Sequence, residues 1–110
     1  MPAVAIRAYT ATTALGQGLR AQAEALESRK SGLRHNDFGD GERLDCWIGR
    51  VAGLEQAALP PAWQEWECRN NRLAWLALQQ DGIPQALAAV VARHGSDRVA
   101  VVVGTSTSSI

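Results

Sequence analysis

The 110-residue chain carries eleven basic and eleven acidic residues, so its formal net charge is zero at neutral pH. The basic residues, all arginine except Lys30, are scattered, and no basic patch indicates a nucleic-acid or anionic-membrane partner. No signal peptide is recognisable, and no apolar stretch reaches the roughly 20 residues of a membrane-spanning helix. We therefore expect a cytoplasmic protein without a membrane or nucleic-acid partner.

The first thirty residues contain an alternating pattern followed by a helical one. Val4 and Ile6 alternate with other side chains over residues 3–10, which predicts a short strand with one better buried face. Leu19, Ala23 and Leu26 then recur at spacings of four and three, which predicts an amphipathic helix over residues 19–29 with these side chains on its buried face. We expect Gly32 to take the left-handed position that ends this helix.

A polar segment over residues 34–44 is rich in turn formers and predicts an exposed loop. Asp37, Asp40 and Glu42 within it resemble part of a calcium loop. The complete series of ligands and the terminal glutamate are missing, however. The segment is therefore interpreted as a solvated turn, and no metal or cofactor site is predicted.

The middle of the chain predicts a strand and then helical structure. Residues 44–51 have extended character, and residues 54–59 are expected to form a helical turn that two prolines end. Residues 62–80 carry the strongest helical pattern, with Asn70 and Asn71 as the expected boundary between two helices. This region predicts a helical pair with a wide apolar face.

Three tryptophans, Trp63, Trp66 and Trp75, lie in this helical region. An aromatic trio can stack nucleic-acid bases, but a base-stacking surface is flanked by basic residues. Such flanking residues are missing from this pattern. We therefore expect the tryptophans to pack in a core or an interface.

The carboxyl-terminal part predicts a helix followed by a strand. Pro84 suits the first turn of a helix, whereas in a helix interior a proline costs about 3 kcal/mol. Gly95 is expected to end that helix, with His94 in its last turn, where a cation favours the helix dipole. The valine-rich residues 98–103 predict a central strand buried on both faces, as in parallel sheets.

The order strand, helix, strand, helix, helix, strand predicts an α/β layered protein with a mixed or parallel sheet. Ligands in such sheets bind at the carboxyl ends of strands, where residues 104–110 are expected to lie. Ser106 in that segment is not predicted to be a nucleophile, because the G-x-S-x-G pattern is missing. Cys46 and Cys68 lack metal-ligand spacing and are expected to be reduced, packed thiols without a catalytic role.

Three stretches carry a resemblance to a known family: TATTALG at residues 10–16 with the helix after it, KSGL at residues 30–33, and RVAVVVGTST at residues 98–107. In this order and separation they resemble the amino-terminal part of the β-ketoacyl-acyl carrier protein synthases, the thiolase-fold condensing enzymes. The sequence RNNRL at residues 69–73 is similar, more specifically, to synthases of bacterial aryl polyene pigments. The resemblance spans essentially the whole chain.

The resemblance implies that residues 1–110 are a single, incomplete segment of a β-ketoacyl synthase domain with a partial thiolase-like layered fold. In the family, an elbow cysteine accepts an acyl chain from acyl carrier protein. Further residues, commonly two histidines, promote decarboxylation of malonyl carrier protein and carbon–carbon bond formation. All of these are expected beyond Ile110, so the segment alone is expected to be inactive. Its substrates would be carried on the phosphopantetheine of acyl carrier protein, and the complete protein would be a homodimer or heterodimer.

Thr107 is the one site residue that the resemblance implies. It matches the loop residue that faces the acyl pocket in elongating synthases, so its size and polarity would influence chain-length preference. The alternative, of equal weight, is that Thr107 and Ser108 cap a following helix. Serines at positions 106, 108 and 109 replace the usual glycines of the family, which changes the expected backbone shape of this loop.

Two other functions stay open. The chain is alternatively part of a non-catalytic partner subunit, similar to the chain-length factors, which keep the fold and lack the elbow cysteine. It is alternatively a free-standing small α/β binding module. The residues that follow Ile110 in the natural gene would distinguish these alternatives from a condensing acyltransferase.

Overall fold

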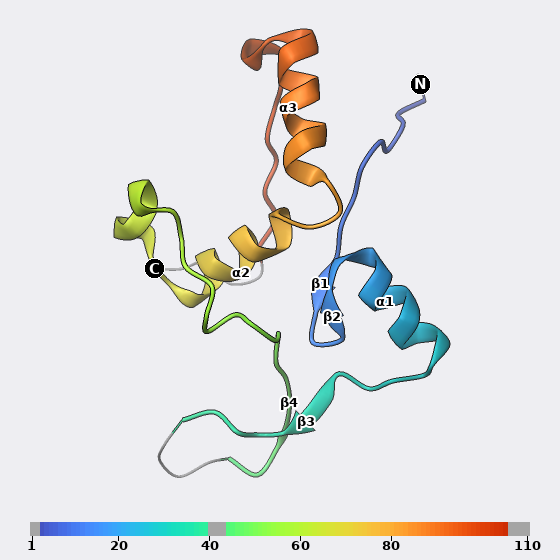
Figure 1. Cartoon of the computed structure of the whole chain (residues 1–110), viewed down its shortest axis with the longest axis vertical. Helices are drawn as coiled ribbons and strands as arrows, with labels where there is room; N and C mark the ends of the chain where they lie inside the picture. Colours follow the sequence, from blue (N-terminus) through green and yellow to red (C-terminus); the bar gives the residue numbers. More distant parts are fainter. Residues whose placement is uncertain (1–2, 40–43, 106–110) are drawn as a thin grey trace.

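The computed structural model describes residues 3–39 and 44–105. These residues form a mixed α/β arrangement with two small antiparallel sheets. The elements branch outward from a common centre, with α3 and the β3–β4 hairpin pointing in opposite directions (Figure 1). The elements in chain order are β1 (Thr12–Thr13), β2 (Gly16–Gln17), α1 (Gly18–Glu27), β3 (Leu33–His35), β4 (Trp47–Gly49), the 3-10 helix η1 (Pro61–Trp66), α2 (Arg69–Leu78), α3 (Ile83–His94) and the 3-10 helix η2 (Ser96–Arg98). The α/β class expected from the sequence is therefore confirmed at this coarse level.

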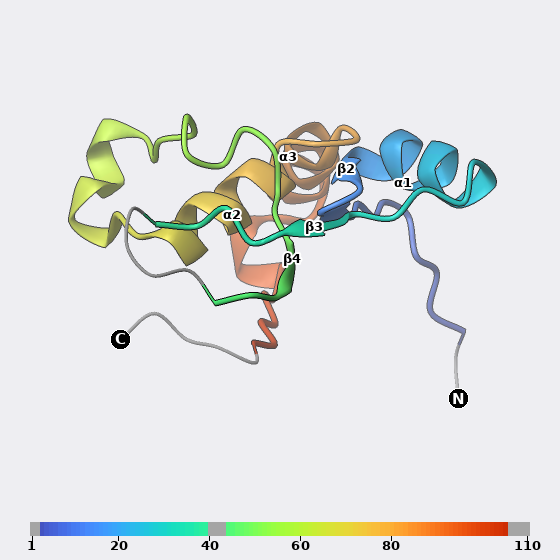
Figure 2. The same ribbon diagram turned by 90° about the horizontal axis from the view of Figure 1, so that it is seen from below.

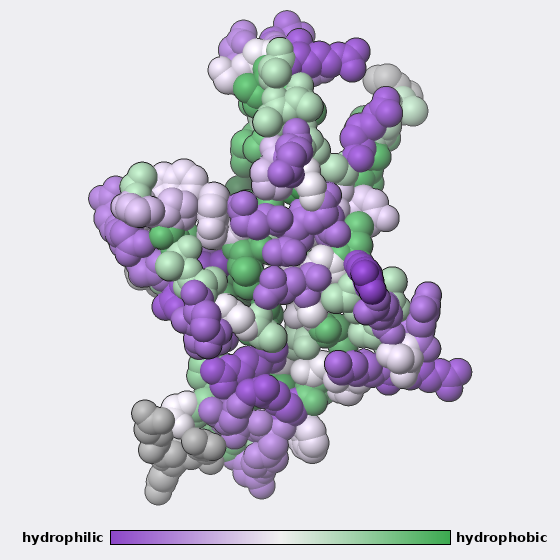
Figure 3. Space-filling model, viewed as in Figure 1, coloured by the Kyte–Doolittle hydropathy of each residue, from purple (hydrophilic) through white to green (hydrophobic). Residues whose placement is uncertain are grey.

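The buried core of the described residues is small. Its hydrophobic members are Ala25, Leu54 and Leu59. The Cα radius of gyration is 17.0 Å, whereas a compact domain of this length has about 13 Å. Figure 3 shows hydrophobic side chains at the surface along α3, next to hydrophilic ones. Most apolar side chains of the described residues therefore remain in contact with solvent.

The strands predicted at residues 3–10 and 98–103 are wrong for the described structure. Residues 3–10 belong to no sheet, and η2 precedes an extended segment that begins at Val99 with φ −113° and ψ 118°. A β-ladder needs a neighbouring strand for its backbone donors and acceptors, and neither segment has one among residues 3–39 and 44–105. The expected burial is also wrong, because Val102 is 94% exposed. In place of a mixed or parallel sheet, the described part contains two antiparallel pairs.

The predicted first helix is confirmed as α1, and the β1–β2 hairpin folds onto its beginning. Gly16 has φ +148°, and a Cβ atom there would lie 2.6 Å from the Cβ of Ala21. The close approach of the hairpin to α1 therefore requires glycine. The Thr13 hydroxyl donates to Gln22 Oε1 at 2.8 Å, and Gln22 Nε2 donates to the Gly16 carbonyl at 2.8 Å. These hydrogen bonds attach the hairpin to the helix.

The end of α1 differs from the prediction. Arg29, two residues after the last helical residue, has φ +52° and takes the left-handed conformation expected at Gly32. Gly32 instead lies against Ala14, whose carbonyl carbon would be 2.9 Å from an added Cβ. The buried face is also shifted by one position, since Ala25 is buried and Leu26 is 72% exposed.

The strand expected within residues 44–51 is confirmed as β4, which pairs antiparallel with β3. His35 of β3 lies opposite Trp47, and their rings are 6.1 Å apart at an angle of 78°. The His35 ring also places Nε2 2.6 Å from Asp45 Oδ1. The start of the loop expected at residues 34–44 is therefore wrong, because backbone pairing with β4 overrides the local preference for turns.

The loop after β3 is attached to the rest of the molecule by arginines. Arg50 and Arg69 both place their guanidinium carbons 4.7 Å from the ring centroid of Phe38. Asp37 Oδ2 accepts a hydrogen bond from Arg34, and Asp37 Oδ1 forms an ion pair with Arg50 Nη1 at 3.1 Å. We call these five residues the Phe38 cluster. Because Arg69 begins α2, the cluster joins the β3–β4 hairpin to that helix.

The stability of the Phe38 cluster is expected to depend on pH. Hydrogen bonding from Arg34 lowers the pKa of Asp37 below its ordinary value, burial opposes this shift, and Arg50 adds to it. A carboxylate with a lowered pKa in the folded state stabilises the fold above its unfolded pKa of about 3.9, and this contribution is lost as the pH falls through the folded-state pKa. We expect the thermal midpoint of Asp37→Asn to fall less than that of the wild type between about pH 6 and about pH 2.

An Asp97→Asn variant provides the control, because Asp97 lies in η2 and outside the Phe38 cluster. This variant should keep the acid dependence of the wild type. If Asp37→Asn lost stability in acid as steeply as the wild type, Asp37 would not couple proton binding to folding in the way that its contacts require.

The helix predicted over residues 62–80 is divided into η1 and α2. The break precedes Arg69 and so lies earlier than the expected boundary at Asn70 and Asn71. Cys68 has an extended backbone with φ −153° and ψ 165°, and its Sγ accepts the N–H of Asn71 at 3.4 Å. A cysteine in the N-cap position therefore begins α2, a role for which serine or aspartate is the usual residue.

The helical turn expected at residues 54–59 is confirmed as a turn, because the Ala57 N–H donates to the carbonyl oxygens of Gly53 and Leu54 at 3.1 and 3.2 Å. The third helix is confirmed as α3. Its first turn contains Pro84, and Gly95, with φ +84°, follows its last residue. Proline and glycine thus occupy the ends at which each is least costly.

Polar side chains join the connection between α2 and α3 to the beginning of α1. Asp81, with φ +52°, accepts from the Thr10 hydroxyl at 2.7 Å and from the Leu19 N–H at 2.9 Å. Gln80 Nε2 lies 3.3 Å from Gln17 Oε1 and donates to it. We call these five residues the polar junction. In both Figure 1 and Figure 2 the beginning of α3 lies beside β2, so segments more than sixty residues apart meet here.

Candidate functional site

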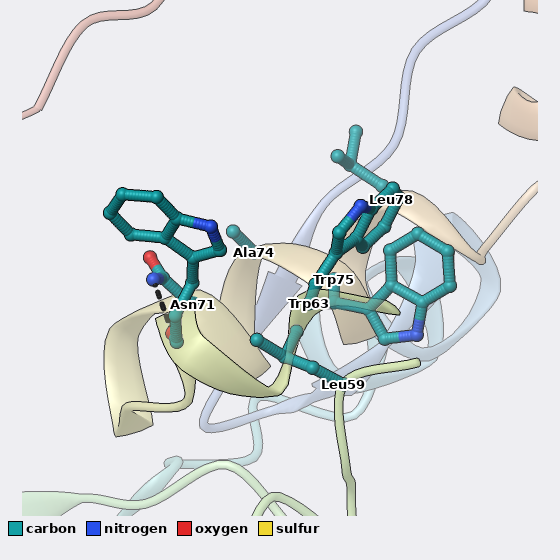
Figure 4. A pocket seen from close by; sticks show the side chains of 7 residues that line it. Leu59, Trp63, Asn71, Ala74, Trp75 and Leu78 are labelled. Carbon is teal, nitrogen blue, oxygen red and sulfur yellow. Dashed lines mark hydrogen bonds between the residues drawn. The ribbon is translucent and has the colours of Figure 1, made fainter. Parts of the chain in front are cut away.

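An apolar groove lies between η1 and α2. Its cavity has a volume of about 380 Å³. Trp63 and Trp75 contact each other edge to face, with ring centroids 5.2 Å apart and an interplanar angle of 83° (Figure 4). We call this the tryptophan groove, and it is lined by Leu59, Trp63, Trp66, Asn71, Ala74, Trp75 and Leu78.

Backbone hydrogen bonds of one buried residue hold η1 beside α2. The N–H of Leu59 donates to Glu67 Oε2 at 3.2 Å, and the Leu59 carbonyl accepts from Gln64 Nε2 at 2.8 Å. The other carboxylate oxygen of Glu67, Oε1, lies 2.5 Å from the Nε of Arg72, a residue of α2. These contacts fix the wall of the tryptophan groove to the helix that forms its floor.

The chemistry of the tryptophan groove is apolar. Asn71 is its one polar lining residue among the described ones, and its Nδ2 already donates to the Trp66 carbonyl at 2.7 Å. No carboxylate, imidazole or thiol of the described residues lines the groove. The groove is therefore suited to cover an apolar surface and has no group for acid–base or nucleophilic chemistry.

A second cavity, of about 250 Å³, lies on another side of α2. Thr12 is one of its lining residues, and the Oγ1 of Thr12 is buried without a hydrogen-bond partner within residues 3–39 and 44–105. A buried hydroxyl without a partner costs about 1–3 kcal/mol. The apolar side chains of α2 make the cavity suited to an apolar chain. We call it the threonine cavity, and it is lined by Thr12, Asn70, Leu73, Ala74, Ala77 and Thr105.

The site residue predicted by the resemblance, Thr107, lies outside the described residues, as does Ser106. Thr105, two positions earlier, lines the threonine cavity. The extended segment that begins at Val99 thus leads toward this cavity, while Ala74 lines both the threonine cavity and the tryptophan groove. Helix α2 therefore separates the two candidate sites.

The remaining residues singled out by the sequence have structural roles or are exposed. Both cysteines are thiols and form no disulfide with each other. Cys68 is half-buried and caps α2, but Cys46 is exposed, so the expected packing of Cys46 is wrong. His94 lies in the last turn of α3, as expected, together with Arg93.

The calcium-like segment shows no ion site in the part that the structure describes. Asp37 belongs to the Phe38 cluster, and Asp40 and Glu42 lie outside the described residues. The described ranges also contain no group of three or more histidine, cysteine, aspartate or glutamate side chains arranged to hold a metal ion. No helix within those ranges combines the length and the apolar character needed to cross a membrane.

Sequence reasoning missed the residues that organise the two cavities and the centre of the molecule. Thr12 was part of a loop motif, and its buried hydroxyl has no signal in the local pattern. Asp81 precedes a glycine and a proline, which indicates a helix interruption. Its hydrogen bonds with Thr10 and Leu19 cannot be predicted from sequence periodicity, because these residues are more than sixty positions away. An aspartate that tolerates a left-handed backbone is the one available clue.

A scan against protein-family models found no match for this chain, and searches among curated proteins and among solved structures found no significant similarity. The geometry of α2 and its two cavities, together with the resemblance in sequence, is therefore the basis for a functional assignment.

Proposed function

We propose that this chain is the amino-terminal part of a β-ketoacyl-acyl carrier protein synthase with a thiolase-like fold. The complete enzyme transfers an acyl group from its carrier-protein thioester to a cysteine that lies beyond Ile110, and the first carrier protein leaves as its free phosphopantetheine thiol. Loss of carbon dioxide from malonyl carrier protein then gives a carbanion, which attacks the acyl-enzyme thioester. The products are 3-oxoacyl carrier protein, carbon dioxide and the free cysteine.

The observation that carries this proposal is the threonine cavity. Leu73, Ala74 and Ala77 of α2 provide an apolar wall, while Thr12 and Thr105 add hydroxyl-bearing side chains. An acyl chain would lie against this apolar wall. In this proposal, Thr107, which the resemblance assigns to the acyl pocket, limits the length of the acyl chain.

Two exposed apolar segments also support a role as one part of a larger fold. Val4 and Ile6 are 92% and 82% exposed, and Val101 to Val103 are at least 80% exposed. Burial of one such side chain stabilises a protein by about 1.5–3 kcal/mol. In the proposed synthase, both segments become strands when the remaining chain supplies their neighbours.

The test is a condensation assay with the complete protein from the natural gene, malonyl carrier protein and acyl carrier proteins of increasing chain length. We expect 3-oxoacyl products by mass spectrometry. A Thr107→Phe variant should lower kcat/KM for the longest accepted acyl chain by about tenfold to a hundredfold, because a bulky ring shortens the cavity. A Thr107→Ser variant, which keeps the hydroxyl and loses a methyl group, should keep the long chains as substrates.

Three outcomes would contradict the proposal in different ways. Condensation that appears only after a second subunit is added would assign the chain to a non-catalytic partner. A Thr107→Phe variant that loses stability while its chain-length preference is unchanged would assign Thr107 to helix capping. Absence of condensation with either arrangement would leave the chain as a binding module and end the acyltransferase proposal.

A further inference from the structure

A third cavity, away from α2, is lined by basic side chains. Arg7 from the amino-terminal segment and Arg93 and His94 from the last turn of α3 surround a surface cavity of about 480 Å³. Ala89 and Val90 form the apolar part of its wall. The cavity thus joins two segments that are more than eighty residues apart in the sequence. We call this the Arg7–Arg93 cavity.

The Arg7–Arg93 cavity has no balancing negative charge. Neither residues 3–10 nor α3 contain an aspartate or a glutamate. Within residues 3–39 and 44–105, no carboxylate forms an ion pair with Arg7, Arg93 or His94. A guanidinium group stays protonated under all ordinary conditions. Two guanidinium groups therefore line one cavity, and solvent, the carboxyl end of α3 or a bound anion offsets their repulsion.

The helix dipole explains part of this arrangement without a ligand. The carboxyl end of a helix favours cations, and Arg93 and His94 lie in the last turn of α3. Arg7 comes from a different segment, however, and lines the same cavity as these two groups. Its position needs a further explanation, which an anion shared by the three side chains provides.

We infer that the Arg7–Arg93 cavity binds a phosphate monoester whose carbon part is apolar. Guanidinium groups match phosphate oxygens with paired hydrogen bonds, and His94 adds an N–H donor. Three donor groups suit the three terminal oxygens of a phosphate monoester better than the two of a carboxylate. Ala89 and Val90 provide the contact for the carbon part, and the volume lies within the usual range of about 300–1,000 Å³ for ligand cavities. This site goes beyond the proposed condensation and does not depend on it.

The test is an NMR titration of the full chain with hexyl phosphate and with inorganic phosphate, observing the arginine side-chain N–H signals. We expect hexyl phosphate to bind about tenfold more tightly than inorganic phosphate, because its alkyl chain covers apolar surface. Arg7→Gln and Arg93→Gln should each weaken binding of both probes by about tenfold. Arg29→Gln, which follows α1 and lies outside the cavity, should leave both affinities unchanged.

A Val90→Ala variant separates the apolar contact from the charge, since it should weaken hexyl phosphate and leave inorganic phosphate unchanged. Co-sedimentation with phosphatidic acid vesicles identifies the source of the phosphate. Retention of the protein on the vesicles indicates a lipid headgroup. If the protein binds hexyl phosphate but is not retained on the vesicles, the ligand is a soluble phosphate monoester. The inference is overturned if neither probe nor vesicle binds, or if Arg29→Gln weakens binding as much as Arg7→Gln. None of these readouts measures condensation, so a failed acyltransferase assay leaves this test independent.

Discussion

Replacing Leu54 with alanine is expected to lower the free energy of unfolding by about 2–5 kcal/mol, because truncation of a fully buried leucine leaves a cavity. The Leu54 side chain is 0% exposed, and Ala25 and Leu59 are the other buried hydrophobic residues of the described part. A core this small has few neighbours that can close the space. The loss would be a large share of the about 5–15 kcal/mol that stabilises a typical domain.

Urea unfolding followed by tryptophan fluorescence measures this effect. Leu26→Ala is the matched control, because it removes the same atoms from a side chain that is 72% exposed. The control should change the free energy of unfolding by no more than about 0.5 kcal/mol. Similar losses in both variants would show that the turn around Leu54 is not the core of the protein in solution.

Replacing Asp81 with alanine is expected to cost about 2 kcal/mol, since it removes the acceptor for the Leu19 N–H at the beginning of α1 and for the Thr10 hydroxyl. A carboxylate at this position also interacts favourably with the positive end of the helix dipole. Asp81→Asn keeps an oxygen acceptor and tolerates the left-handed backbone at φ +52°. It should recover part of the loss.

Thermal unfolding followed by circular dichroism compares these variants, with Asp97→Ala as the control, because Asp97 lies in the separate helix η2. We expect the order of midpoints to be wild type, Asp81→Asn and Asp81→Ala, with the control near the wild type. If Asp81→Ala melted with the wild type, the polar junction would not contribute to the stability of the fold.

The elements that could be predicted are those that local sequence alone determines. Helix α1 follows from the spacing of its apolar residues, and α3 follows from Pro84 at its start and Gly95 at its end. Strand β4 follows from an apolar run between turn formers. The interactions that form the two helices lie within a few residues of one another, and β4 has its partner, β3, nearby in the sequence.

The predicted strands at residues 3–10 and 98–103 depend on partners that a local pattern does not specify. Valine-rich sequence favours an extended backbone, and Val99 has one. Pairing also requires a second strand at the correct distance and register, and the described residues supply none. The valine-rich composition of residues 98–103 therefore predicted the extended backbone at Val99 correctly and the burial of the valine side chains wrongly.

The candidate site was predictable only in part for a similar reason. The tryptophan pattern predicted packing in a core or an interface. Trp63 contacts Trp75, but Trp63 and Trp66 are 47% and 63% exposed, so their expected position in a core is wrong. The threonine cavity combines Thr12, α2 and Thr105, which lie in three distant parts of the chain. Its lining comes together only in the folded structure. No spacing rule joins these residues.

The perpendicular indoles of Trp63 and Trp75 give the protein an internal optical probe. At a centroid separation of 5.2 Å, the electronic transitions of the two rings are coupled, and the coupling depends on their mutual angle. Any molecule or chain segment that enters the tryptophan groove has to contact these rings, because both line it. Near-ultraviolet circular dichroism of the unlabelled protein would thus report directly when this groove becomes covered.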